Sequence, residues 1–231
     1  MISEMFAHGF IQRAFIGGVL VSLCAALLGV ILVLKRYSMI GDGLSHVSFG
    51  ALSIAIALGF APIKFSIPIV IIAAFFLLRL AENGKMKSDA AIAMVSASSL
   101  AIGVIVTSLT TGLSTDVCSY MFGSILAMSK DDVIFSVVLS VVVLIMFGFC
   151  YHRIFAVTFD ESFSKATGVK VGMYNTLISI FTAVTVVLGI KMMGAMLISS
   201  LIIFPALTSM RVFKSFLSVT ICSAILAVIN F

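Results

Sequence analysis

Eight long apolar segments separated by short polar breaks dominate the sequence. They cover residues 14–34, 44–61, 65–80, 90–109, 133–152, 172–190, 192–210 and 215–231. A helix needs roughly 20 apolar residues to cross the hydrocarbon core of a bilayer. The breaks between the segments carry the glycine, asparagine, aspartate, serine and lysine residues that are typical of turns. The pattern therefore predicts an all-α, polytopic transmembrane helical bundle of about eight spans.

The composition excludes the main soluble classes. The chain of 231 residues is 62% hydrophobic and only 10% charged, and its mean hydropathy is +1.30. A soluble domain has roughly 45–50% apolar and about 25% charged residues. No single globular core could hide so much apolar surface, so a soluble enzyme or a nucleic-acid-binding domain is excluded. With three prolines and few charges, the chain is not disordered either.

The basic residues predict how the bundle is oriented. When the eight spans alternate across the membrane, ten Lys and Arg residues fall on one side and four on the other. The ten are Lys35, Arg36, Arg79, Lys85, Lys87, Arg153, Lys165, Lys170, Arg211 and Lys214, and the four are Arg13, Lys64, Lys130 and Lys191. Basic loops stay in the cytoplasm, so the first side is predicted to be cytoplasmic. The N-terminus and the 110–131 loop then face outward.

Asp42 and His46 are the polar residues whose chemistry is most specific. They lie four residues apart at the entry to the second predicted span, so a helix places both on one face. A carboxylate and an imidazole offer an oxygen and a nitrogen ligand to a divalent transition metal, and ionisable groups at membrane depth mark ion paths. Two alternatives stay open. Asp42 can interact with the free amides and dipole of a helix N-terminus, and His46 can be a packing residue.

The longest cytoplasmic run contains a second candidate site. Thr158 and Glu161 fit a capping box, a short amphipathic turn carries Phe159 and Phe163, and Gly168 closes it. A capped helix between two spans is either an interfacial connector or a docking element for a cytoplasmic partner, and the residues alone leave both open.

Four stretches, in order and spacing, resemble one known family. The run 35–46, KRYSMIGDGLSH, is similar to the signature of the membrane subunit of bacterial ABC importers for zinc, manganese and iron. The runs 116–126, DVCSYMFGSIL, 159–169, FDESFSKATGV, and 194–206, GAMLISSLIIFPA, resemble three further motifs of that family. Together the four matches extend over nearly the whole chain, so the chain is identified as a member of this family.

The resemblance implies a type II ABC importer-like fold and a defined set of partners. It implies a multi-pass permease of the bacterial plasma membrane that works as a homodimer, with ATP-binding cassette ATPase subunits and an extracytoplasmic metal-binding protein. A Walker A sequence is missing from the chain, so ATP hydrolysis is expected on a separate subunit and this chain is not expected to be an enzyme. Zinc, manganese or iron would be transported cargo rather than a permanent cofactor.

The resemblance also assigns the site residues. It makes Asp42 and His46 the candidate metal ligands in the translocation path. It makes the 159–169 segment the candidate element that couples the chain to the ATPase. The coupling residues are Phe159, Asp160, Glu161, Phe163 and Gly168. We expect one permease domain over 1–231, with a C-terminus shortened relative to the family, whose members usually continue for another hairpin or helix.

Two other functions remain to be weighed against metal import. The first is a related permease for metal chelates or cobalamin, although so large a substrate would not need an Asp/His pair one helical turn apart. The second is a membrane scaffold or assembly subunit that transports nothing. The scaffold hypothesis predicts that neutralising Asp42 leaves metal uptake unchanged.

Overall fold

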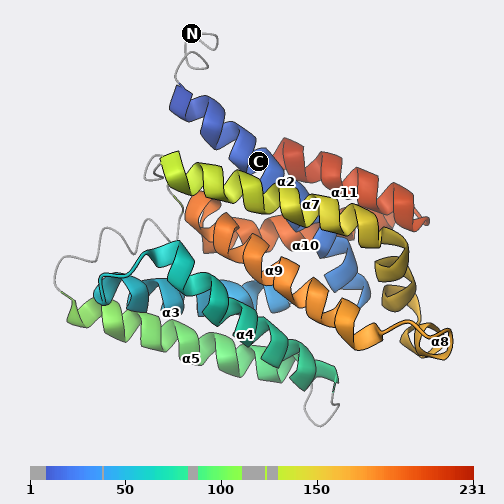
Figure 1. Ribbon diagram of the computed structural model, residues 1–231, viewed down its shortest axis with the longest axis horizontal. Helices are drawn as coiled ribbons and strands as arrows, with labels where there is room; N and C mark the ends of the chain where they lie inside the picture. Colours follow the sequence, from blue (N-terminus) through green and yellow to red (C-terminus); the bar gives the residue numbers. More distant parts are fainter. Residues whose placement is uncertain (1–8, 38, 83–87, 111–122, 124–129) are drawn as a thin grey trace.

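The structure is a computed structural model that describes residues 9–37, 39–82, 88–110, 123 and 130–231. The regular elements within these ranges are helices, as predicted, and Figure 1 shows them lying side by side along the long axis of the molecule. In chain order they are α2 (Gly9–Leu34), α3 (Ile40–Ala57), α4 (Pro62–Glu82), α5 (Ser88–Leu109), α7 (Lys130–Phe159), α8 (Glu161–Ala166), α9 (Val171–Met193), α10 (Ala195–Val212) and α11 (Phe216–Asn230).

The long helices match the predicted spans one for one. Six of them are long and apolar enough to cross a membrane, and α4 and α11 contain shorter apolar stretches. With these two, the described residues contain one long helix for each of the eight predicted segments. Most of the predicted outer loop 110–131, and the basic residues Lys85 and Lys87, lie outside the described residues.

Two boundaries differ from the sequence prediction. Helix α7 continues seven residues beyond the predicted end at 152, because the rings of Phe155 and Phe159 contact each other and the ring of Phe216 at the start of α11. The tight break predicted at 190–192 lies instead at Gly194, whose φ of 85° ends α9 and allows α10 to begin at once. A left-handed φ is cheap for glycine, which explains why the break falls there.

The core is built around α9, which packs against α2, α3, α4, α7 and α10. Its central stretch, 181–190, is buried without interruption. The outward faces of α5 and α7 instead carry large exposed apolar side chains such as Ile105 and Phe149. In water such faces would aggregate, whereas in a bilayer they meet lipid of equal polarity.

Small residues bring the helices close together where the core is tightest. Gly29 of α2 lies directly against the backbone of Ile202 in α10, and Gly50 of α3 lies against the backbone of Ser99 in α5. Glycine at a contact point lets two membrane helices approach until their backbones touch. These contacts hold α2 closely against α10 and α3 closely against α5.

Helix α8 lies at one end of the bundle, at the right in Figure 1. Because the spans alternate in direction, the end of α2, the start of α3, the end of α7 and the start of α9 lie towards the same end. The basic residues Lys35, Lys165, Lys170 and Lys214 belong to this end, so the positive-inside rule makes it the cytoplasmic end.

Candidate functional site

The connection between α2 and α3 sets the position of the Asp42/His46 pair. Helix α2 closes with a Schellman motif, in which the amide of Tyr37 donates to the carbonyl of Leu32 and the amide of Arg36 donates to Val33. Arg36 holds a φ of 62°, the one positive φ at a non-glycine residue in the described part of the chain. Helix α3 then begins at Ile40. The chain therefore reverses direction over five residues.

Asp42 and His46 lie in the first two turns of α3 and on the same face, as the spacing predicts. The Oδ2 atom of Asp42 lies 3.7 Å from Nε2 of His46, and their side chains are 46% and 27% exposed, respectively. The N-cap position of α3 belongs to Met39, which has no side chain that can cap. Asp42 occupies the first turn, where the helix dipole favours a carboxylate, so this alternative role stays compatible with its place.

The glycines on either side of Asp42 allow α3 to pack closely against its two neighbouring helices. A Cβ atom at Gly41 would lie 3.2 Å from the Ile202 side chain of α10, and one at Gly43 would lie 2.6 Å from Ile92 of α5. One turn further on, the hydroxyls of Ser45 and Ser199 form a 3.0 Å hydrogen bond between α3 and α10. The backbone that carries the pair is thus held closely by two neighbouring helices.

The described residues of one chain supply too few ligands to enclose a metal ion. Among the described residues, no group of three or more His, Cys, Asp or Glu side chains lies close enough together to hold one. The pair provides one oxygen and one nitrogen, whereas a stable transition-metal site takes four or more ligands. Within the described part of the chain, Asp42 and His46 therefore form an open, incomplete site with both side chains partly exposed.

The predicted cytoplasmic helix forms, but its cap differs from the prediction. Asp160, in an extended conformation, is the N-cap of α8, and its Oδ1 accepts a 2.8 Å hydrogen bond from the amide of Phe163. The capping box from Thr158 to Glu161 is wrong, because Thr158 still belongs to α7 and its hydroxyl donates to the carbonyl of Ile154.

The predicted C-terminal end of α8 is confirmed. Gly168 has a φ of 81°, its amide donates to the carbonyl of Lys165, and the next amide, of Val169, donates to Ser164. This is a Schellman motif, which needs a left-handed residue at the position of Gly168. The rings of Phe159 and Phe163 are 59% and 65% exposed. The end of α7 and helix α8 therefore each present one aromatic ring at the cytoplasmic end of the bundle.

Glu161 turns inward, an arrangement that the sequence did not indicate. Its Oε1 atom lies 2.7 Å from Nζ of Lys35, which also donates to Oδ1 of Asn175 at 2.6 Å. Burial acts to raise the pKa of the Glu161 carboxyl, but the hydrogen bonds from Lys35 and Asn175 and the charges of Lys35 and Lys165 outweigh it and hold the pKa below its ordinary value. Lys35 and Glu161 are 126 positions apart, so no local pattern connects them.

The comparisons with known proteins agree with the four sequence motifs. The model of the ABC 3 transport family matches residues 7–231. The chain belongs to this family. It is 28% identical to the manganese import system permease protein ScaB of Streptococcus gordonii, over 94% of this chain and 78% of that protein. It is also 28% identical to the high-affinity zinc uptake system membrane protein ZnuB of Haemophilus influenzae, over 86% of this chain and 76% of that protein.

A solved structure shares the fold of this ABC 3 family chain. It is PsaBC from Streptococcus pneumoniae in complex with Fab, with a TM-score of 0.85, 27% identity, and coverage of 99% of this chain and 84% of that chain. The resemblance inferred from the motifs is confirmed at the level of family and fold. The chain is a multi-pass membrane permease of the bacterial plasma membrane.

Two of the family-like stretches meet in space. Gly123, from the 116–126 run, has a φ of 77°, and a Cβ atom there would lie 2.3 Å from the backbone carbon of Met193. Gly194, which begins the 194–206 run, is the next residue and also has a positive φ. A glycine at each position lets the two backbones touch at the end of the bundle opposite α8. The remainder of the 116–126 run lies outside the described residues apart from Gly123.

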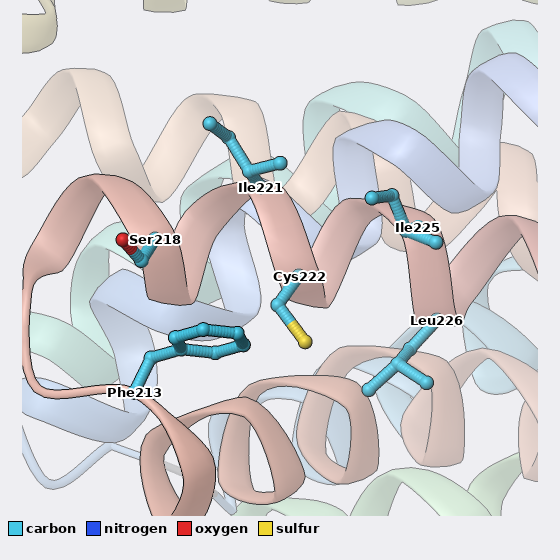
Figure 2. Close-up of a pocket in the computed structure, with 6 residues that line it drawn as sticks. All are labelled: Phe213, Ser218, Ile221, Cys222, Ile225 and Leu226. Carbon is cyan, nitrogen blue, oxygen red and sulfur yellow. The ribbon is translucent and has the colours of Figure 1, made fainter.

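An apolar cavity of about 330 Å³ on α11 is not part of this site. Figure 2 shows Cys222 and Leu226 pointing to the same side of α11 as the ring of Phe213. Ser218 and Cys222 supply the few polar atoms of the lining, and the rest is aliphatic or aromatic. Such a lining suits hydrocarbon and offers no set of oxygen and nitrogen ligands for a dication.

Proposed function

We propose that this chain is the pore-forming permease subunit of an ABC importer that carries a divalent transition metal, zinc, manganese or iron, across the plasma membrane. The observation that carries the proposal is the Asp42/His46 pair, which lies half exposed on a helix that is otherwise packed among its neighbours. Ionisable side chains within membrane-spanning helices usually mark an ion or substrate path. Relatives named for manganese import and zinc uptake support the same class of cargo.

The permease works as a homodimer in this proposal, because the described residues of one chain supply only two ligands at this site. A second copy that presents the same face would bring two carboxylates and two imidazoles to one ion, which is a full ligand set for a first-row dication. An oxygen and nitrogen set of this kind suits zinc, manganese and iron alike. Selection among the three metals then rests largely with the extracytoplasmic binding protein that delivers the ion.

Transport proceeds by alternating access. The binding protein delivers the ion from outside, the two Asp42/His46 pairs coordinate it transiently, and nucleotide turnover rocks the helices until the ion is released inside. Ligands shared between two chains can separate when the subunits move, which keeps binding weak enough for release. No permanent cofactor takes part.

The ATPase subunits dock on α8 in this proposal. The exposed rings of Phe159 and Phe163 give an apolar anchor, Asp160 and Gly168 fix the two ends of the helix, and Glu161 joins it to the rest of the chain. Aromatic side chains on a rigid support are the usual energetic centre of a protein interface. Hydrolysis of ATP belongs to the docked subunits.

Substitution of the pair tests the proposal. We expect Asp42→Asn and His46→Ala each to lower ATP-dependent uptake of radioactive zinc or manganese about tenfold or more, because each removes one of few ligands. The assay uses vesicles that contain the permease, its ATPase and the binding protein. Asp42→Asn is the sharper variant, since asparagine caps a helix about as well as aspartate but is a much poorer ligand for a dication.

Matched controls lie elsewhere on the same chain. Asp131→Asn and His152→Ala change the same residue types at exposed positions of α7, and both should keep the wild-type rate. Wild-type uptake in the Asp42→Asn variant would leave only the helix-end role of Asp42 and would refute the metal site. It would then favour the scaffold hypothesis, which predicts unchanged uptake.

A further inference from the structure

Three polar side chains from separate parts of the chain form a closed triangle at the cytoplasmic end. Lys35 follows α2, Glu161 is the first residue of α8, and Asn175 lies in the second turn of α9. Lys35 donates from Nζ to Glu161 and to Asn175, and Asn175 donates from Nδ2 to Oε1 of Glu161 at 3.2 Å. We call these three residues the latch.

The latch adds a connection that the chain itself does not provide. Helix α8 is joined by the backbone to α7 and α9 and packs against those same two helices. Lys35 is what ties α8 to the end of α2. The Lys35 side chain is 6% exposed and Asn175 is 8% exposed, whereas the Glu161 side chain is 37% exposed, so the interaction is shielded from water on the side of α2 and α9 and reaches water at Glu161. A shielded, charge-assisted hydrogen bond is stronger than an exposed one.

Lys35 also lies just before the turn that sets the direction of α3, the helix that contains Asp42 and His46. The next residue, Arg36, holds the strained left-handed conformation that ends α2, and α3 begins four residues later. Asp42 is seven residues from Lys35 along the chain. Strain of this kind persists only where the surroundings hold it. A shift of Lys35 therefore changes the orientation of α3 relative to α2.

We propose that the latch transmits movement of the docked ATPase from α8 to α3, with Lys35 and Glu161 as positioning residues for the Asp42/His46 pair. The proposal rests on the proposed function for the identity of the cargo and of the docked partner. If the latch served only to stabilise the fold, apolar residues would do so as well or better, because a partly shielded ion pair adds little net stability compared with apolar packing. What it adds is a fixed geometry between two elements that move.

Four variants separate this role from a general loss of structure. Lys35→Met removes the charge at similar length. Lys35→Met combined with Glu161→Gln removes both charges, so that no shielded charge is left without a partner. Lys35→Glu combined with Glu161→Lys exchanges the two charges, and the Asn175 amide can serve the exchanged pair after a half-turn of its side chain, since it both donates and accepts. Lys170→Met is the matched control, because Lys170 is exposed at the same end of the bundle.

The first measurement is the number of metal ions taken up per ATP hydrolysed by the complete importer in vesicles. For the single and the double neutral variants we expect this ratio to fall about tenfold, within the usual range of coupling between two sites. Hydrolysis and co-purification with the ATPase should persist in the Lys35→Met variant, whose substitution lies outside α8. The exchanged pair should restore the ratio, and Lys170→Met should leave it unchanged. A proportional loss of hydrolysis and uptake, or no recovery in the exchanged pair, would overturn the proposal.

The second measurement does not depend on metal. Met39, at the start of α3, is replaced by cysteine in a chain whose four native cysteines are changed to serine, and its labelling by a water-soluble maleimide is timed with and without ATP and vanadate. We expect the labelling rate to change with nucleotide when the latch is intact and to stay constant in the double neutral variant. Nucleotide-dependent labelling in the double variant would overturn the proposal. If the complex transports no metal but its labelling depends on the latch, the proposed metal cargo is refuted and the proposed role of the latch is supported.

Discussion

Replacing Gly29 by alanine tests how closely α2 and α10 are packed. The added methyl carbon would lie 1.9 Å from the carbonyl oxygen of Ile202. Carbon–oxygen contacts between packed helices are about 3.3–3.6 Å long, so the two helices would have to separate by about 1.4 Å at this point. The atom in the way belongs to the backbone and cannot rotate aside. We therefore expect α10 to be displaced along the turn that contacts both α2 and α3.

The expected loss of stability follows from two opposing effects. Overpacking of a dense core costs about 1–3 kcal/mol, and a rigid backbone obstacle places Gly29→Ala near the upper limit. The alanine recovers about 1 kcal/mol of helix propensity, so the net loss of unfolding free energy is about 2 kcal/mol. For a chain of this size, 1 kcal/mol corresponds to a Tm change of about 2–4 °C, which gives a decrease of about 4–8 °C.

Thermal unfolding of the purified protein in detergent measures this effect, and two other glycines calibrate it. Gly148→Ala, in α7, meets no atom within 4 Å and should leave Tm equal or slightly higher. Gly50→Ala would bring a methyl carbon 2.8 Å from the Ser99 carbonyl oxygen and should fall between the two. A Tm for Gly29→Ala at or above that of Gly148→Ala would show that α2 and α10 are not in backbone contact.

The remaining predictions concern the ends and the charge of α8. Asp160→Ala should weaken the helix by about 1 kcal/mol and lower affinity for the ATPase in a pull-down titration, whereas Asp160→Asn, which still caps, should not. Gly168→Val forces a β-branched residue into a left-handed φ and should abolish stimulated ATP hydrolysis and uptake while metal binding persists. The pKa of Glu161 is held below its ordinary 4.5, so its stabilisation is complete above that pH and is lost as pH falls through the lower folded-state value. The Tm difference between wild type and Glu161→Gln should accordingly vanish in acid.

The spans were predictable because lipid imposes one rule on every segment that crosses it. A run of apolar residues long enough to cross must be a helix, and the eight runs became eight helices. The ends of the helices were less predictable. Sequence patterns cannot tell whether Thr158 or Asp160 caps α8, because both side chains can do so. The ring contacts of Phe155 and Phe159 with Phe216 decide the matter by prolonging α7 past Thr158.

For the candidate site too, features that depend on local spacing could be predicted, and features that depend on distant contacts could not. The shared face of Asp42 and His46 follows from helical spacing alone and is confirmed by the structure. Their role as metal ligands stays a prediction, as does the shortened C-terminus. The burial and pairing of Lys35 could not be predicted from local spacing. At the end of a span it is interpreted as one more cytoplasmic charge, yet the fold encloses it and pairs it with a residue 126 positions away.

Helix α10 explains how a displacement at the end of α2 would reach Asp42 and His46. The same residue, Ile202, meets Gly29 of α2 through its backbone and Gly41 of α3 through its side chain. Gly41 is the immediate neighbour of Asp42, and Ser199, one turn before Ile202, is hydrogen-bonded to α3 at Ser45. Packed interfaces of this density move between discrete arrangements and do not deform continuously. If the latch shifts α2 relative to α10, the turn that contains Ile202 must keep or lose its contacts with α2 and α3 together. Asp42, next to Gly41, would then move with α3.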